Sequence, residues 1–346
     1  MAGGTGGHIF PGIAVARELL ARGVPVVWLG GRKGLESQLV PGAGIQLETI
    51  DFSGVRGKGL LAFMLAPLRL ARAVLAARRL IAGLAPRSVL SMGGYAAAPG
   101  GIAAWLLKRP LVVHEQNRVA GFTNRLLARL ARRVLGGFDG ALPGAEWIGN
   151  PVRAEIAAMP PPGEADHTGS LHILVLGGSQ GAASLNTQLP LVFQRRGSAP
   201  ALDIRHQCGG KHLDKTRAAY SQAGIEARIE PFIDDMAAAY AWADLVICRA
   251  GALTIAELCA AGVAAILVPF PAAVDDHQTR NAEMLVEVGA ACLVAEGEDF
   301  VRRIGVAIDG LARDRGRLSG MAAAARALAR PQAAARIADI CLEVAA

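Results

Sequence analysis

The sequence is poor in cysteine. Its 346 residues include five Cys, an odd number, and no two of them have the C-x-x-C spacing. The low count and the spacing argue against a disulfide framework and against a zinc site, and they fit a reducing cytoplasm. The chain also lacks a G-x-S-x-G elbow, which argues against hydrolase chemistry of the Ser-His-Asp type.

Two common nucleotide-binding signatures are also missing. The glycine loop Gly3–His8 does not continue as G-x-G-x-x-G, because position 9 is Ile. No acidic residue ends the next expected strand, where residues 28–31 read Trp-Leu-Gly-Gly, and this counts against NAD. No G-x-x-x-x-G-K-[ST] sequence occurs, which counts against an ATP-hydrolysing P-loop.

Acidic residues are absent between Asp51 and Glu115, a stretch that holds nine Lys and Arg. Residues 1–150 carry 18 basic and 7 acidic side chains, a net charge of +11, whereas residues 151–346 carry 18 and 22, a net charge of −4. Unlike charges attract at long range, so we expect the N-terminal half to bind an anionic partner.

An uninterrupted membrane span is missing too. Residues 88–107 are uncharged and long enough to cross a bilayer, but two glycine-containing stretches, 92–95 and 99–101, interrupt them. No secretory signal is evident at the N-terminus. We therefore expect a protein that touches a membrane surface without crossing it.

The pattern that is present alternates short β-branched runs with Ala/Leu-rich stretches. Strands are expected at 24–29, 45–50, 88–90, 111–113, 172–176, 244–248 and 265–269, with helices starting near Pro11, Leu60, Pro99 and Gly121 and a helix over 182–194. Such alternation predicts parallel sheets covered by helices on both faces. The pattern restarts near residue 172, so we predict two doubly wound domains facing a cleft, 1–150 and 151–330. A final helix within 331–346 could pack on either domain, the first included.

Three glycine-containing turns lead into helices. They are Gly3–His8, Gly177–Gly181 and 249–251, the last followed by a helix from Ala252. Backbone N–H groups and the positive end of a helix dipole form an anion site at such a turn, although each is also compatible with a tight strand–helix connection. At the third turn, a diphosphate would receive N–H bonds from residues 253 and 254, and Glu257 would accept bonds from a ribose diol.

Two polar segments follow expected strands. The run 114–117, His-Glu-Gln-Asn, comes directly after 111–113, at the edge where open α/β sheets bind ligands. The loop 275–281 holds Gln278 and Asn281, whose amides can bond sugar hydroxyls. A divalent-metal site at Asp275, Asp276 and His277 is disfavoured, because adjacent carboxylates point in different directions and no further oxygen ligands cluster there.

Taken together and in order, seven motifs resemble the MurG family of bacterial UDP-N-acetylglucosamine transferases. They are 3–11 (GGTGGHIFP), 92–95 (MGGY), 114–117 (HEQN), 149–153 (GNPVR), 177–182 (GGSQGA), 232–236 (FIDDM) and 249–254 (RAGALT). The resemblance covers nearly the whole chain and implies a GT-B fold of two Rossmann-like domains, with the acceptor domain first. It implies inverting transfer of GlcNAc from UDP-GlcNAc to the C4 hydroxyl of the muramyl sugar of lipid I, giving lipid II and UDP.

The resemblance also implies roles for particular residues. His8 is the candidate general base. The residues implied to bind UDP-GlcNAc are Thr5, Gly6, Gly7, Asn117, Arg153, Ser179, Ile233, Ala252, Leu253, Thr254, Ile255, Ala256, Glu257 and Gln278. Those implied on the acceptor side are Gly93, Gly94, Tyr95, His114 and Glu115. No cofactor and no metal are implied.

The implied partners are UDP-GlcNAc, undecaprenyl-linked lipid I and an anionic membrane surface, without nucleic acid, and cell-wall or division proteins stay open. The implied location is the cytoplasmic face of the bacterial inner membrane. The family pattern has an apolar strand before the first glycine loop, where this sequence has Met1 and Ala2, so we expect a less stable first domain. A UDP-GlcNAc 2-epimerase and a non-catalytic UDP-sugar-binding scaffold are the alternatives.

Overall fold

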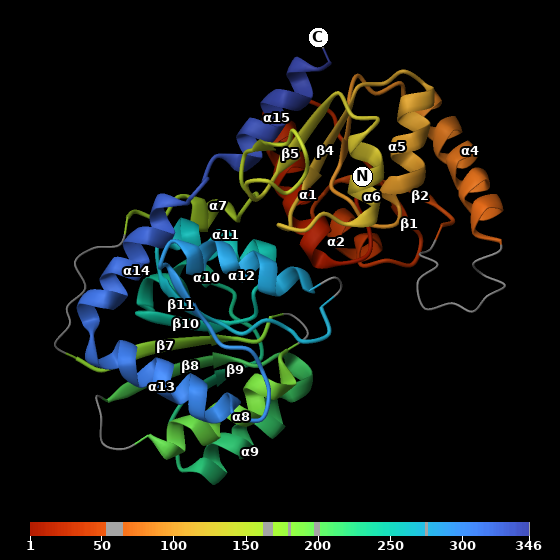
Figure 1. The fold of residues 1–346 in the computed structure, drawn as a ribbon. Coiled ribbons are helices and arrows are strands. Elements are labelled where there is room, and N and C mark those ends of the chain that lie inside the picture. The colour runs from red at the N-terminus through yellow and green to blue at the C-terminus, as the bar shows by residue number, and fades with distance from the viewer. Residues whose placement is uncertain (53–64, 162–168, 179–180, 197–200, 274–275, 346) are drawn as a thin grey trace. The chain divides into compact units, whose positions relative to one another are not determined.

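The chain folds into two compact units. Unit 1 contains Met1–Val152 and Arg330–Ala346, and unit 2 contains Arg153–Ala329. The computed structural model describes residues 1–52, 65–161, 169–178, 181–196, 201–273 and 276–345 (Figure 1). Ser179 lies outside the described residues. Each unit is an α/β structure, as the alternating sequence pattern predicts.

Unit 2 contains one parallel sheet of six strands in the order β12-β11-β10-β7-β8-β9. The strands are β7 (Leu171–Leu176), β8 (Leu202–Gln207), β9 (Arg228–Glu230), β10 (Leu245–Cys248), β11 (Ala264–Leu267) and β12 (Ala291–Leu293). This order is that of a doubly wound, Rossmann-like sheet. The order reverses between the neighbouring strands β7 and β10, where Leu176 lies opposite Cys248. The chain leaves these two strands into two of the expected glycine turns.

Helices cover both faces of this sheet. They are α7 (Ala154–Ala157), α8 (Ala183–Arg195), α9 (Leu213–Ala223), α10 (Met236–Trp242), α11 (Ala252–Ala261), α12 (His277–Glu287), α13 (Phe300–Arg313) and α14 (Arg315–Ala327), with a short 3₁₀ helix, η1 (Gly210–His212). Figure 1 shows α8, α9 and α13 on one face and α10, α11 and α12 on the other. Every residue of β10 and β11 is buried, which explains why these strands read as continuous apolar runs.

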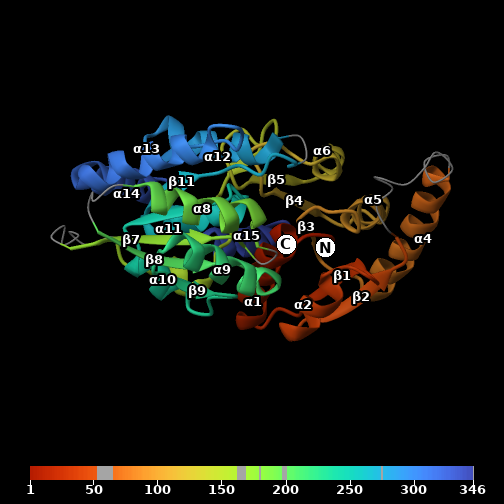
Figure 2. The ribbon, with the colours of Figure 1, turned by 90° about the horizontal axis from the view of Figure 1, so that it is seen from below.

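Unit 1 repeats this plan with its strands in two parallel groups, β1-β2 and β3-β4-β5-β6. The strands are β1 (Val27–Gly31), β2 (Gln46–Ile50), β3 (Val89–Ser91), β4 (Leu111–Glu115), β5 (Arg133–Gly136) and β6 (Glu146–Trp147). The helices are α1 (Gly6–Ala21), α2 (Glu36–Gly42), α4 (Ala66–Leu84), α5 (Ala97–Leu106), α6 (Phe122–Ala128) and α15 (Ala333–Glu343). Helix α15 packs on α1, and α4 lies beside α5 and β2 (Figure 2).

The first two residues lie between the two strand groups. The Met1 amine donates to Leu90 O at 2.8 Å, and Met92 N donates to Met1 O at 2.9 Å, which continues a ladder on the β3 side. Ala2 is fully buried, and its carbonyl accepts a hydrogen bond from Trp28 Nε1 at 3.1 Å on the β1 side. The turn that begins at Gly3 therefore leaves the middle of unit 1 and leads into α1.

Three local expectations are wrong in detail. Helix α1 begins at Gly6 rather than near Pro11, so His8 belongs to its first turn and Pro11 lies inside the helix. His114 and Glu115 are the last residues of β4 and do not follow it, because their backbones continue the pairing with β5. Residues 277–281 belong to α12 rather than to a loop. None of the described helices is long and apolar enough to cross a membrane.

A buried imidazole lies at the end of β8 in unit 2. His206 is fully buried, with Nδ1 2.8 Å from the Tyr220 hydroxyl and Nε2 3.0 Å from Asn186 Oδ1. Burial lowers the pKa of His206 from 6.5 to about 3, because a charged ring is poorly solvated there. The unfolded chain therefore binds a proton below pH 6.5 that the folded chain excludes.

This difference predicts a loss of stability on mild acidification. Between the unfolded pKa of about 6.5 and pH 5, the His206 contribution should lower the free energy of unfolding by about 2 kcal/mol, and the loss should grow as the pH falls toward 3. Urea unfolding of the wild type and of His206→Gln at several pH values checks this, since the variant lacks the titrating ring. The same pH dependence in both chains would contradict the assignment.

Candidate functional site

Two glycine-containing loops meet at the carboxyl end of β3 in unit 1. The first begins at Gly3, and the second contains Gly93 and Gly94. Gly93 and Gly94 have φ values of +92° and +83°, a region that side chains disfavour. A Cβ on Gly94 would lie only 2.0 Å from the carbonyl oxygen of Gly3. Glycine is therefore required here so that the second loop can approach the backbone of the first.

A buried carboxylate holds these loops together. Glu36 is fully buried and accepts hydrogen bonds from Gly4 N at 3.2 Å, Gly31 N at 2.9 Å and the Tyr95 hydroxyl at 2.9 Å. Burial, and then the neighbouring Glu36, raise the pKa of Tyr95 to about 12, so its hydroxyl stays a donor at neutral pH. The three donors come from three separate segments of the chain. Their hydrogen bonds to one carboxylate fix these segments relative to one another.

The first turn of α1 faces the same edge. Thr5 is the N-cap, and its side chain makes no capping bond. Within the described chain, the N–H groups of Gly6 and Gly7 donate to no acceptor, whereas those of His8 and Ile9 bond to Thr5 O. Free N–H groups at the positive end of a 16-residue helix favour an anion or a polarised hydroxyl.

A chain of hydrogen bonds runs from His8 into the protein. His8 Nδ1 lies 2.6 Å from Gln116 Oε1, and Gln116 Nε2 lies 3.0 Å from His114 Nδ1 and 2.9 Å from His114 O. His114 Nε2 lies 2.9 Å from the carbonyl of Gly149. Burial lowers the pKa of His114 against smaller opposing contributions from Gly149 and Glu115, so this imidazole is neutral.

A second buried carboxylate orders the loop after β4. Glu115 is 1% exposed and accepts hydrogen bonds from the backbone N–H of Asn117, the Asn117 amide, the backbone N–H of Gly121 and the Asn124 amide, at 2.9–3.3 Å. Asn124 also donates to His114 O at 3.1 Å. The ends of the 117–124 loop are thereby fixed to the final residues of β4.

In unit 2, the loop after β7 is held by β8. Gly178 N donates to Gln207 Oε1 at 3.0 Å, and Gln207 Nε2 donates to Gly178 O at 3.1 Å. A Cβ on Gly181, which has φ +76°, would lie 2.4 Å from Cys208 O. The glycines here allow backbone to lie against backbone beside the start of α8.

The turn after β10 leads into α11, whose first N–H groups have no acceptor among the residues that the structure describes. Gly251 is the N-cap, the first backbone bond runs from Ile255 N to Gly251 O at 2.9 Å, and no side chain caps the helix. Arg249 anchors the turn by donating to Val268 O and Pro269 O, both at 3.2 Å, and by an ion pair with Glu296 at 2.7 Å. The start of α11 is therefore a rigid group of N–H donors.

One turn into α11, Glu257 forms a compact cluster with two partners. Arg153 donates to both of its oxygens, at 2.9 and 3.1 Å, and the Tyr240 hydroxyl donates to Oε2 at 3.1 Å. The Glu257 side chain is 12% exposed, whereas that of Arg153 is 45% exposed. Burial raises the pKa of Tyr240 well above 10, with Glu257 adding to the effect, so the phenol stays a donor that orients the carboxylate.

The two other predicted residues of unit 2 lie near strand ends. Ile233 is buried in the connection from β9 to α10, and its backbone N–H and C=O bond to no group among the described residues. Gln278 lies in the first turn of α12, where its Oε1 accepts a hydrogen bond from Phe270 N at 2.9 Å. Ile233 lies in the connection that follows β9, and Gln278 lies at the start of the helix that follows β11.

Within each unit the predicted residues gather at one edge, and the sequence reading missed several residues that hold them. The missed residues are Glu36, Asn124, Gln207 and Tyr240. Gln116 stands inside the His-Glu-Gln-Asn run, which the sequence placed at the ligand-binding edge without a role for this residue. Glu36 and Tyr240 carry no such signal, because only folding brings them to the loops that they orient.

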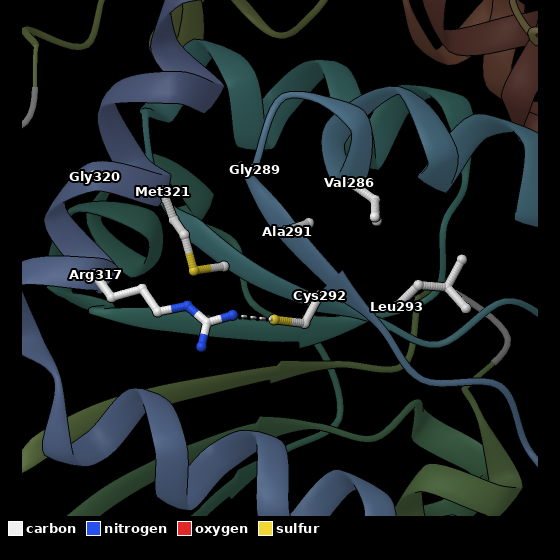
Figure 3. Close-up of a pocket in the computed structure, with 8 residues that line it drawn as sticks. All are labelled: Val286, Gly289, Ala291, Cys292, Leu293, Arg317, Gly320 and Met321. Atoms are coloured by element: carbon white, nitrogen blue, oxygen red, sulfur yellow. Dashed lines mark hydrogen bonds between the residues drawn. The ribbon is translucent and has the colours of Figure 1, made fainter.

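A separate hollow of about 600 Å³ lies elsewhere in unit 2. It is lined by Val286, Gly289, Ala291, Cys292, Leu293, Arg317, Gly320 and Met321 (Figure 3). The Arg317 guanidinium points toward the Cys292 sulfur at 3.8 Å. These residues come from α12, β12, the connection between them and α14, and none is a predicted site residue. Across the described ranges, no group of three or more His, Cys, Asp or Glu could hold a metal ion.

Two models of known families match the chain. The glycosyltransferase family 28 N-terminal domain matches residues 1–136, and the family 28 C-terminal domain matches residues 172–337. A UDP-N-acetylglucosamine–N-acetylmuramyl-(pentapeptide) pyrophosphoryl-undecaprenol N-acetylglucosamine transferase of Xanthomonas euvesicatoria pv. vesicatoria (strain 85-10) is 56% identical over 347 residues, which cover 100% of this chain and 80% of the relative. The chain belongs to the MurG family.

Other relatives of this chain belong to the same family. A transferase of the same name from Xylella fastidiosa (strain M12) is 56% identical over 99% of the chain and 94% of its own length. The crystal structure of Acinetobacter baumannii MurG is 38% identical, with a TM-score of 0.86 over 99% of this chain and 98% of that one. The chain is thus a hexosyltransferase of family 28 with the two-domain GT-B fold. A structure described as a putative UDP-N-acetylglucosamine 2-epimerase from Listeria monocytogenes, at 14% identity and a TM-score of 0.63, shares the fold alone.

The contact between the two loops of unit 1 predicts that alanine destabilises the protein more at Gly94 than at Gly44. Gly94→Ala should lower the free energy of unfolding by more than about 2 kcal/mol, because the new Cβ clashes with the Gly3 carbonyl and residue 94 has a positive φ. Gly44→Ala is the matched control, since Gly44 has φ +75° and nothing within 4 Å of its Cβ position. Melting temperatures of the two variants compare these costs, and equal values would contradict the close contact.

Proposed function

We propose that the chain transfers N-acetylglucosamine from UDP-GlcNAc to the C4 hydroxyl of the muramyl sugar of lipid I, with inversion, giving lipid II and UDP in peptidoglycan synthesis. The observation that carries this proposal is 56% identity, over the full chain, to transferases named for that reaction. The ordered donors and carboxylates at the strand ends of both units support it.

Unit 2 is proposed to bind the donor. The N–H groups of Ala252, Leu253 and Thr254 at the start of α11 would bind the diphosphate, with Ile255 and Ala256 completing the first turns, and Glu257 would accept the ribose hydroxyls. The backbone of Ile233 would meet the uracil, and Gln278 would bind the GlcNAc. Arg153, already paired with Glu257, would orient that carboxylate, and Ser179 is assigned to the donor by its motif alone.

Unit 1 is proposed to bind the acceptor. Gly93, Gly94 and Tyr95 border the edge where His8 lies, and His114 and Glu115 order the segments beneath it. Thr5, Gly6, Gly7 and Asn117 also lie in unit 1, and their motifs assign them to UDP-GlcNAc rather than to the acceptor.

The proposed reaction gives each of these residues a role. The C4 hydroxyl oxygen of the acceptor attacks the anomeric carbon of GlcNAc and gives its proton to the His8 imidazole. The bond from that carbon to the β-phosphate oxygen breaks, and UDP leaves with the bonding electron pair. Negative charge grows on the β-phosphate, where the α11 donors stabilise it as preorganised dipoles without a metal.

The first test is turnover. The purified chain, given UDP-GlcNAc and a lipid I analogue in EDTA, should form the disaccharide and UDP, and His8→Ala should lower kcat about 10²–10⁴-fold. His172→Ala, at the amino end of β7, is the control. Epimerised UDP-sugar, or no product at all, would contradict the proposed transfer. A normal kcat in His8→Ala would show that His8 is not the general base. A strict need for Mg²⁺ would contradict a reaction step without a metal.

The second test concerns the donor. Glu257→Ala should weaken UDP-GlcNAc binding by about 1.5–3 kcal/mol, because bonds from two hydroxyls to a carboxylate are lost. Glu155→Ala, on the exposed face of α7, serves as the matched loss of a carboxylate. Calorimetry compares the two, and unchanged affinity in Glu257→Ala would remove this residue from the donor site.

Attachment to the membrane belongs to the same proposal. On α4, Leu68 and Leu75 are 60% and 53% exposed, and Arg72 and Arg79 share their stripe of the helix at spacings of three and four residues. Trp105 and Leu106 on the neighbouring α5 are each about half exposed. This apolar and basic surface supports peripheral binding at the cytoplasmic face of the inner membrane, where lipid I would be reached.

Charge reversal tests this surface. Each basic residue near an anionic leaflet contributes about 1 kcal/mol, so Arg72→Glu, Arg78→Glu and Arg79→Glu together should release the protein from anionic vesicles. Turnover of a short-chain soluble acceptor should change little. Lys215→Glu, Arg217→Glu and Arg313→Glu, all exposed in unit 2, are the matched control. Unchanged co-sedimentation of the α4 variant at low salt would place the membrane-binding surface elsewhere.

A further inference from the structure

Backbone carbonyls fix the orientation of the Gln116 amide. Gln116 Nε2 lies 2.9 Å from His114 O, and a carbonyl oxygen accepts but never donates a hydrogen bond. The nitrogen of this amide must therefore face His114 O, and the oxygen must face His8. The second N–H of the same nitrogen meets His114 Nδ1 at 3.0 Å. That atom has a lone pair because His114 Nε2 carries the proton that it donates to Gly149 O.

This orientation decides which nitrogen of His8 carries the proton. Gln116 Oε1 can only accept, and it lies 2.6 Å from His8 Nδ1, so the proton of a neutral His8 is on Nδ1. The lone pair is then on Nε2, which bonds to no group within the described residues. Gln116 is 1% exposed, so water does not compete for its amide.

We propose that Gln116 is a positioning residue that holds His8 in the Nδ1–H tautomer and so leaves Nε2 free to receive the proton of the acceptor hydroxyl. The inference rests on the proposed function, because His8 is a base only there. Once Nε2 has taken the proton, the Nδ1–H of the imidazolium still donates to Gln116 Oε1. The ring therefore keeps its orientation on both sides of the transfer.

The surrounding structure keeps this chain of bonds intact. Burial lowers the pKa of His114, and a neutral ring preserves the lone pair that accepts from Gln116. Asn150 Nδ2 donates to Gln116 O at 2.9 Å and fixes the backbone of the positioning residue. Gly149, at φ +89°, has its Cβ position filled by the side chain of Arg330, so only glycine fits where its carbonyl meets His114.

Nitrogen NMR on the full chain tests the tautomer without substrate. In protein carrying ¹⁵N-histidine at about pH 8, where imidazoles are largely neutral, a protonated ring nitrogen resonates far from an unprotonated one. The His8 signals, assigned by their loss in His8→Ala, should show a protonated Nδ1 and an unprotonated Nε2. A protonated Nε2 in the wild type would overturn the inference and leave the transferase function itself untouched.

Variants of Gln116 test whether this residue sets the tautomer of His8. Gln116→Met removes the acceptor, so the His8 signals should change to a mixture of tautomers and kcat should fall about 10²-fold, with the KM for UDP-GlcNAc unchanged. Gln116→Glu keeps an acceptor toward His8 and should restore the Nδ1–H signals and part of kcat. His114→Leu leaves the carbonyl of residue 114 in place and should keep the wild-type tautomer. Wild-type His8 signals in folded Gln116→Met would overturn the role of Gln116.

Discussion

The close approach of one backbone to another at the ends of the central strands is the constraint on which both candidate sites depend. In unit 1, the loop at Gly94 lies against the Gly3 carbonyl, and in unit 2, Gly181 lies against the Cys208 carbonyl. A side chain at either glycine would separate the loops and move the first turn of the following helix. In unit 1, the N–H groups of Gly6 and Gly7 that we assign to substrate belong to the turn that follows Gly3, so their positions depend on this contact between two backbones.

Buried polar side chains then hold the loops in place. Glu36 and Glu115 each accept several hydrogen bonds from neutral groups, and in unit 2 the Gln207 amide bonds both polar atoms of the Gly178 backbone. A buried carboxylate is costly unless its lone pairs are satisfied, so loss of one donor would affect the whole loop. Such an arrangement gives rigid sites of the kind that electrostatic catalysis requires.

Much of the fold was predictable from periodicity. Each of the expected strands overlaps an observed one, because residues buried on both faces of a parallel sheet read as short apolar runs. The boundaries were less accurate. Helix α1 begins five residues before the expected Pro11, because the glycines of the loop adopt the helical turn, and β4 includes the polar pair His114 and Glu115 because pairing with β5 continues past the apolar run.

The sequence by itself determined the family, the two-unit α/β organisation and the residue types at the strand ends, because glycines and polar side chains at fixed spacings are local features. Only the tertiary structure decided which partners those residues have. Glu257 meets Arg153 and Tyr240, and His8 meets Gln116, across separations of 17 to 108 residues. No local pattern encodes these pairs, because they form only when distant strands end at the same edge of a sheet. In our proposal, the proton position on His8 likewise follows from a distant group, the backbone carbonyl of His114, which acts through Gln116.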